Sequence, residues 1–164
     1  MGPPRRIVIV GCAGTGKSVL ARRIGAAASM PVVCLDELRR SLPGPLDPAK
    51  FRALVRETHA GDSWVSDGNF CEVSFDLRLP RADLIVWLER PKMLCVWRTC
   101  VRVFRAGETH RLRELGRVLH YIYNFERRKR ALIEAERTKH GAKVPVVRLH
   151  SGADITALLN HLTV

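Results

Sequence analysis

A segment near the start of the chain combines glycines, a lysine and a serine at a spacing that suits phosphate binding. Residues 11–18 read Gly-Cys-Ala-Gly-Thr-Gly-Lys-Ser, which fits the pattern G-x-x-x-x-G-K-[ST] at every fixed position and follows an apolar run at residues 7–10. Glycines let the backbone turn consecutive N–H groups toward one anion, the lysine adds positive charge for the β- and γ-phosphates, and the serine hydroxyl can bind Mg²⁺. We therefore expect a nucleoside triphosphate site that consists of Gly11, Cys12, Ala13, Gly14, Thr15, Gly16, Lys17, Ser18 and Val19.

Two aspartates stand where apolar, strand-like runs end. Asp36 closes the second run and Asp67 closes the third, so both carboxylates should emerge at the sheet edge where the phosphate loop lies. We expect Ser18 and Asp67 to hold Mg²⁺, and Asp36 to orient or deprotonate the hydroxyl of an acceptor molecule. The alternatives are a helix-capping carboxylate at residue 36 and an Asp-Gly turn at residues 67–68.

Arginines in the second half of the chain share one helix face. Arg98, Arg102 and Arg105 are spaced i, i+4 and i+7, beside an apolar stripe at residues 94–104 that we expect to be buried and that includes Trp97 and Phe104. Guanidinium groups stabilise a phosphoryl group in transfer. Residues 98–130 hold ten basic and three acidic side chains, a surplus of seven within the chain's net charge of +12. We favour phosphate handling for this segment, with a solvated face and contact with nucleic acid as the alternatives.

The composition limits the classes of protein to consider. With 164 residues, of which 46% are hydrophobic, we expect one domain over residues 1–164. The five cysteines are scattered without a C-x-x-C pair, which predicts reduced thiols and no zinc site. No apolar stretch approaches the ~20 residues of a membrane span, so we expect a cytoplasmic protein without a membrane partner, as a monomer or homodimer. The three tryptophans are expected in the core and the six histidines in structural roles.

The periodicity of apolar residues predicts an α/β architecture. Strand-like runs occur at residues 7–10, 32–35, 64–66, 84–88 and 144–149, and helical patterns at residues 17–28, 49–59, 91–104, 115–122 and 151–162. Nearly continuous apolar strands are typical of a parallel sheet that is covered on both faces. Breaks at residues 43–45 and 106–110 predict loops that either close over substrates or connect elements passively.

Together these motifs resemble the adenylate kinase-like P-loop proteins, and within them most closely the DNA topology modulation protein group. The resemblance rests on the phosphate loop, Leu35-Asp36, Trp64-Val-Ser-Asp-Gly-Asn-Phe70, Ala82-Asp-Leu-Ile-Val-Trp-Leu88, Leu94-Cys-Val-Trp-Arg98 and Tyr123-Asn-Phe125. It implies a three-layer P-loop NTPase fold with a five-stranded parallel sheet in the order 2-3-1-4-5. It also implies ATP on the loop, an acceptor pocket after the second strand, and an arginine-bearing lid at about residues 105–114.

The chain departs from that family at the acceptor side. Asp67-Gly68 is similar to the Asp-Gly pair of nucleoside monophosphate kinases, but Asn69-Phe70 replaces the usual Phe-Pro-Arg and so removes an arginine that grips the acceptor phosphate. After the second strand, Leu38, Arg39 and Arg40 stand where the topology modulation group usually has a tryptophan. We expect an acceptor pocket that consists of Asp36, Arg40, Asp67, Gly68 and Asn69.

The function that these observations predict is the transfer of the γ-phosphoryl of ATP to a small polar acceptor, either a nucleoside, a nucleotide or another small metabolite. Lys17, Asp36, Arg98 and Arg102 are the expected catalytic residues. The sequence leaves GTP open as the donor in place of ATP, with Mg²⁺ as the cofactor. The rival hypothesis is a nucleotide-binding regulator or NTPase that associates with nucleic acid, the less favoured partner.

Overall fold

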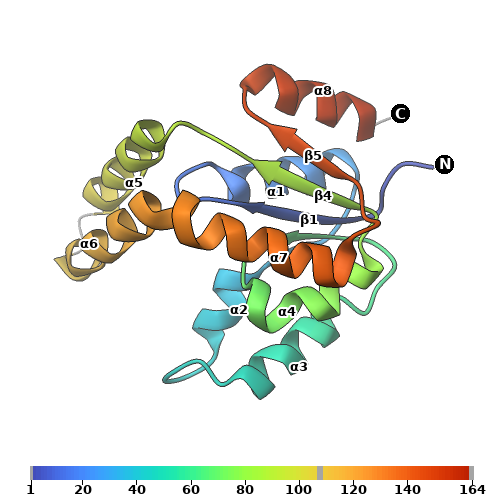
Figure 1. Cartoon of the computed structure of the whole chain (residues 1–164), viewed down its shortest axis with the longest axis horizontal. Helices are drawn as coiled ribbons and strands as arrows, with labels where there is room; N and C mark the ends of the chain where they lie inside the picture. Colours follow the sequence, from blue (N-terminus) through green and yellow to red (C-terminus); the bar gives the residue numbers. More distant parts are fainter. Residues whose placement is uncertain (1, 107–108, 163–164) are drawn as a thin grey trace.

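The chain forms a parallel β-sheet with helices on both faces (Figure 1). The computed structural model describes residues 2–106 and 109–162, and within them it leaves the side chains of residues 105–106, 109–114 and 126 undescribed. The strands are β1 (Arg6–Gly11), β2 (Val32–Cys34), β3 (Trp64–Asp67), β4 (Leu84–Leu88) and β5 (Val146–Leu149). They are ordered β2-β3-β1-β4-β5 and every neighbouring pair is parallel, which confirms the predicted fold class.

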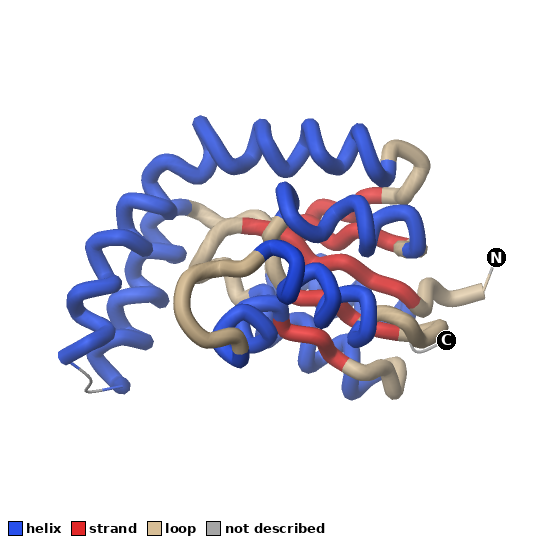
Figure 2. Tube along the Cα trace, turned by 90° about the horizontal axis from the view of Figure 1, so that it is seen from below, coloured by secondary structure: helices blue, strands red, loops and turns tan. Residues whose placement is uncertain are grey.

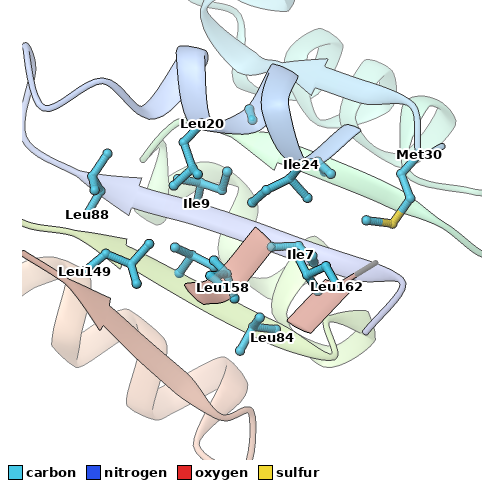
Figure 3. Close-up of a cluster of buried hydrophobic side chains, with 13 residues drawn as sticks. Ile7, Ile9, Leu20, Ile24, Met30, Leu84, Leu88, Leu149, Leu158 and Leu162 are labelled. Atoms are coloured by element: carbon cyan, nitrogen blue, oxygen red, sulfur yellow. The ribbon is translucent and has the colours of Figure 1, made fainter. Parts of the chain in front are cut away.

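Alternation along the strands divides the core into two layers. On β1, Ile7 and Ile9 face α1 (Lys17–Ala27) and α8 (Gly152–Leu162), and Figure 3 shows this cluster. Val8 and Val10 belong to the cluster on the opposite face, with side chains from α4 (Cys71–Arg78), α6 (Thr109–Asn124) and α7 (Arg130–Gly141). Successive side chains of a strand point to opposite faces, so adjacent residues of β3 also serve different layers.

The remaining elements flank the sheet or connect its layers. A smaller core around Phe51 and Val55 joins α2 (Leu35–Ser41) to α3 (Pro48–Thr58). α5 (Lys92–Ala106) and α6 lie side by side and extend beyond the sheet, as Figures 1 and 2 both show. A short 3-10 turn, η1 (Leu79–Arg81), follows α4, and a π-helical segment, η2 (Phe125–Lys129), joins α6 to α7. None of the described helices is both long and apolar enough to cross a membrane.

The secondary structure differs from the sequence prediction at several points, among them α2, α4 and α7, which lie outside the predicted helical patterns. The chain enters α2 at Leu35, so Asp36 lies in the first turn of a helix rather than at the end of a strand. α4 was not predicted because its buried face carries Ser74 and Arg78 beside Cys71 and Phe75, and polar residues at these positions conceal the helical spacing of apolar ones. The predicted break at residues 106–110 is narrower, since α6 already begins at Thr109.

The apolar stripe on α5 was assigned to the wrong face. Trp97 and Phe104 are 61% and 69% exposed, whereas Cys95, Thr99 and Val103 are buried. The helix packs through small side chains because it approaches the phosphate loop closely. Consequently its largest apolar side chains face solvent.

Candidate active site

The phosphate loop needs glycine for its backbone angles and for its close contacts. Gly11, Gly14 and Gly16 have φ values of +147°, +78° and +101°, a region that side chains rarely adopt. A Cβ on Gly11 would also lie 2.3 Å from the carbonyl oxygen of Leu88, and one on Gly14 would lie 2.4 Å from that of Cys95. β4 and α5 therefore hold the loop tightly from two sides.

The loop ends at the N-terminus of α1, which carries no competing group. The helix begins after Gly16 without a side-chain cap and without an acidic residue in its first turn, so its N–H groups and positive dipole end are directed at the loop. The ammonium group of Lys17 donates a hydrogen bond of 2.8 Å to the carbonyl oxygen of Cys12. Burial lowers the pKa of Lys17, and the charge of Asp67 opposes this shift. An anion at the loop would relieve that cost of burying the charge.

A serine and an aspartate lie beside the loop, and one oxygen of the aspartate has no hydrogen-bond partner among the described residues. The hydroxyl of Ser18 donates a hydrogen bond of 2.5 Å to Oδ2 of Asp67. Asp67 is only 2% exposed, and its Oδ1 has no hydrogen-bond partner within the described part of the chain. Burial raises the pKa of this carboxyl, while Ser18 and Lys17 oppose the shift. A hydroxyl and a carboxylate oxygen are ligands that Mg²⁺ prefers, so these residues fit the expected ion.

Mg²⁺ at this position would take its other ligands from phosphates and water. No group of three His, Cys, Asp or Glu side chains that could enclose a metal occurs among the described residues. Mg²⁺ is commonly bound in this way, through one or two protein oxygens and substrate phosphates. The donor set at Ser18 and Asp67 is therefore consistent with an ion that arrives with a nucleotide.

Asp36 lies where two cavities meet. The first, which we call the apolar cavity, has a volume of about 400 Å³ and is lined mainly by Leu46, Phe70, Cys71, Val73, Tyr121 and Ile133. The second, the basic cavity, has a volume of about 560 Å³ and is lined by Arg39, Arg40, Thr99 and Arg102 together with apolar side chains of α5 and α6. Asp36 borders both, and Lys17 borders the apolar cavity.

The arginines expected at the site come from two helices. Arg98 on α5 donates a hydrogen bond of 3.2 Å to the carbonyl oxygen of Thr15 in the loop. Arg102, one turn later, lines the basic cavity. From α2, Arg40 donates through Nε to the main-chain oxygen of Asp36 at 3.2 Å and lines the same cavity. The side chain of Arg105 lies outside the described residues.

Asn69 has its polar atoms engaged within the protein. Its Oδ1 accepts from the Gly11 amide at 3.1 Å, and its Nδ2 donates to the Gly11 carbonyl oxygen and to the Tyr121 hydroxyl, each at 2.9 Å. Burial raises the pKa of Tyr121 to about 12. This amide thus joins the strand end before the loop to α6, and only the outer side of Asn69 lines the apolar cavity.

Gly68 and Phe70 shape the floor of the apolar cavity. Gly68 has a φ of +131°, and its carbonyl oxygen accepts a hydrogen bond from the buried Arg78. Phe70 has a φ of +33°, which is uncommon for a bulky residue, and its ring lies 4.9 Å from that of Phe51. This backbone turn brings an aromatic ring to the edge of the cavity.

Three residues of the site had no signal in the sequence. Thr99 is 1% exposed, its hydroxyl has no partner within the described residues, and the hydroxyl lies 2.9 Å from the position of a Cβ on Gly14. Arg78 and Tyr121 are placed by α4 and α6. None of the three belongs to a motif, because each reaches the site through helix packing rather than through loop spacing.

The chain matches solved structures of kinases at low identity. One is shikimate kinase from Acinetobacter baumannii in complex with shikimate, at 18% identity and a TM-score of 0.58, covering 96% of this chain and 90% of that one. Another, from Chloroflexus aurantiacus j-10-fl, is assigned only provisionally as a kinase; it has 14% identity and a TM-score of 0.61, covering 98% and 94%. No protein-family model and no curated protein sequence matches. The fold is therefore that of the P-loop kinases.

Proposed function

We propose that this protein transfers the γ-phosphoryl group of ATP, bound with Mg²⁺, to a hydroxyl of a small polar molecule. The observation that carries the proposal is the arrangement of Lys17, Ser18 and Asp67 beside the phosphate loop, with a buried carboxylate oxygen that has no partner among the described residues. A structural ion pair would satisfy that oxygen. A site that binds a magnesium–nucleotide complex leaves this oxygen without a partner in the protein.

Each residue around the loop has its own role in the proposed reaction. The acceptor oxygen attacks the γ-phosphorus, the bond between that phosphorus and the β–γ bridging oxygen breaks, ADP leaves, and the hydroxyl proton passes to the carboxylate of Asp36. Lys17, Arg98 and Arg102 offset the negative charge that spreads over the phosphate oxygens. Ser18 and Asp67 would hold Mg²⁺, which neutralises further charge on these oxygens when bound.

A closing segment completes the proposal. The arginine-bearing lid that we expect at about residues 105–114 includes the junction of α5 and α6, where residues 107–108 lie outside the described part of the chain. Arg98 and Arg102 stand on the helix that leads into it. We infer that closure of this expected lid over the phosphates excludes water before transfer.

Two measurements test the proposal together. Calorimetry should register binding of Mg·ATP or Mg·GTP, and a coupled assay for ADP should show turnover that depends on an acceptor. The Lys17→Ala variant should keep its circular dichroism spectrum and lose the turnover. Unchanged phosphoryl transfer in this variant would reject the assignment, and ADP formation that is indifferent to every acceptor would indicate simple hydrolysis instead.

A second candidate function is favoured by the surface of α5. Met93, Trp97 and Phe104 are 77%, 61% and 69% exposed, on a helix that contains lysine and arginine but no acidic residue. Exposed aromatic rings among basic groups are the pattern that binds single-stranded nucleic acid. A regulator of this kind would show strong, steeply salt-dependent affinity for DNA that responds to ATP, whereas a kinase would bind DNA weakly.

A further inference from the structure

Two positive charges line the apolar cavity, and each has a partner within the protein. Lys129 lies 3.4 Å from the carboxylate of Glu72, so the two form an ion pair at the cavity wall. Lys17 is bound to the Cys12 carbonyl and faces the phosphate loop. Of the described residues that line this cavity, these two are the only cations, and each already has a partner, so the cavity holds no unpaired positive charge among its described residues.

An arginine behind the cavity floor also donates its hydrogen bonds within the protein. Arg78 is fully buried behind the segment that forms the cavity floor. Its guanidinium donates to the hydroxyls of Ser66 and Ser74 and to the carbonyl oxygens of Gly68 and Asn69. A buried guanidinium that satisfies four acceptors holds the floor in place, and Arg78 is not among the residues that line the cavity.

The basic cavity has the opposite character. Arg40 and Arg102 line it, and so does Thr99, whose hydroxyl lies beside the phosphate loop and has no partner among the described residues. Phosphate groups would find charge and hydrogen-bond donors there. Because Asp36 borders both cavities, a hydroxyl at this carboxylate can face phosphates on one side while the rest of the molecule occupies apolar surroundings on the other.

We propose that the acceptor is an uncharged alcohol with a ring, whose body lies in the apolar cavity and whose reactive hydroxyl lies at Asp36. This inference rests on the proposed function and specifies its substrate class. A volume of about 400 Å³ falls within the range of small-molecule sites, ~300–1,000 Å³, and Phe70, Tyr121 and Ile133 offer flat and aliphatic surface to a ring. A carboxylate or phosphate placed there would lose its hydration without gaining a counter-ion, which is costly.

Matched pairs of acceptors test the charge requirement directly. Each pair keeps the ring and changes the charge: thymidine with thymidine 5′-monophosphate, guanosine with guanosine 5′-monophosphate, and methyl shikimate with shikimate. ADP formation is measured with Mg·ATP, and binding is measured by ligand-observed NMR with Mg·ADP present to fill the donor site. We expect the neutral member to exceed its charged partner at least tenfold in kcat/KM and in affinity. Preference for a charged member, equal preference, or no binding of any neutral member would overturn the inference.

A substitution in the cavity wall provides the second test. Leu46→Arg introduces a guanidinium at a side chain that is 36% exposed, so the fold should tolerate it. The matched control is Val147→Arg, which has the same 36% exposure but lies on β5 and outside this cavity. We expect Leu46→Arg to shift the preference at least tenfold toward the charged members and Val147→Arg to leave it unchanged. An identical response of the two variants would contradict the placement of the acceptor.

The two proposals fail in different ways. If neutral members bind but no acceptor accelerates ADP formation, the phosphoryl transfer is wrong and the assigned cavity stands. If transfer occurs and requires a charged acceptor, the transfer stands and the assigned substrate class is wrong.

Discussion

Two polar clusters lie on opposite sides of β3, and they differ in whether the protein satisfies them. Ser66 and Asp67 are adjacent, so their side chains point to opposite faces of the sheet. Ser66 belongs to a cluster with His59 and Arg78, and Asp67 to a cluster with Lys17 and Ser18. Both residues of the strand are at most 2% exposed, so burial alone does not distinguish the two sites.

The cluster around Ser66 is closed. Nδ1 of His59 lies 2.8 Å from the carbonyl oxygen of Val55, which can only accept, so Nδ1 carries the proton. Nε2 is then bare and accepts from the Ser66 hydroxyl at 2.8 Å, and the same hydroxyl accepts from Arg78 at 3.0 Å. Every polar group in this chain of hydrogen bonds has a partner, which is the signature of a structural network.

The cluster around Asp67 is open. One carboxylate oxygen has no partner among the described residues, and the Lys17 ammonium is held only by a main-chain carbonyl among the hydrogen bonds of the described residues. A protein tolerates such groups where a ligand completes them. The difference between these neighbours teaches that hydrogen-bond satisfaction, rather than burial or residue type, distinguishes the proposed site from the structural cluster behind it.

The largest expected effect comes from the open cluster. Lys17→Met should lower kcat with any competent acceptor by about 1,000-fold, in line with the loss of a preorganised positive group. Because burial lowers the pKa of Lys17, its charge is costly to the fold, and the thermal midpoint should stay the same or rise. Steady-state kinetics and calorimetric unfolding of the same samples measure both. A large drop in the thermal midpoint would show that Lys17 belongs to the structural class after all.

The closed cluster should control how stability depends on pH. Burial, and then the charge of Arg78, lower the pKa of His59 from 6.5 to about 4. Between these values the unfolded chain binds the proton and the folded chain does not, so stability is complete above pH 6.5 and decreases as the pH falls toward 4. The loss over this window should amount to roughly 3 kcal/mol.

Urea unfolding at pH 4.5 and 7.5 tests this dependence, with His59→Gln as the variant that removes it. The pKa of Asp67 is raised by burial, so this carboxyl acts in the opposite direction and stabilises the fold as the pH falls. Asp67→Asn therefore serves as the control, and it should steepen the loss of stability in acid. A pH profile that His59→Gln leaves unchanged would disprove the role of the histidine.

The sequence predicts the open cluster around Asp67 better than the closed cluster around Ser66. The phosphate loop and Asp67 were predicted as site residues from spacing, because loops and strand ends place such residues directly. The strand order of the sheet was also expected, from the resemblance to known families, and is confirmed. Ser18 in the phosphate loop and Asp67 at a strand end were expected to lie together, and the 2.5 Å hydrogen bond between them shows that they do.

The closed cluster could not be predicted from spacing. Arg78 sits at a buried helix position where the pattern calls for an apolar residue, and its partners come from β3, α4 and the turn after β3. The same reason explains the misassigned face of α5, since contact with the loop selects small residues such as Thr99 over large ones such as Trp97. Side-chain size at a helix contact depends on the neighbouring backbone, which a single sequence does not reveal.

A smaller effect is expected for Arg78→Met. The substitution keeps the aliphatic volume but leaves the carbonyl oxygens of Gly68 and Asn69 without donors, at about 1 kcal/mol each. Burial lowers the pKa of Arg78 to about 9, which shows that its charge is costly to bury. Removing this charge therefore offsets part of the cost. We expect a net loss of about 1 kcal/mol in urea unfolding and weaker acceptor binding. Arg78→Lys should not restore either, because a lysine cannot reach four acceptors at once.

The finest test compares two serines of identical chemistry. Ser66→Ala removes a buried hydroxyl with two partners and should cost about 1 kcal/mol in unfolding free energy while leaving the magnesium requirement unchanged. Ser18→Ala removes the donor to the buried Asp67 carboxylate, so it should cost a similar amount of stability, and it alone should raise the Mg²⁺ concentration for half-maximal turnover about tenfold. Titrations of Mg²⁺ and urea on both variants measure the four quantities. If both serines changed the magnesium requirement, the division between an open proposed site and a closed structural cluster would not hold, because hydrogen-bond satisfaction would then fail to predict which neighbour serves the ligand.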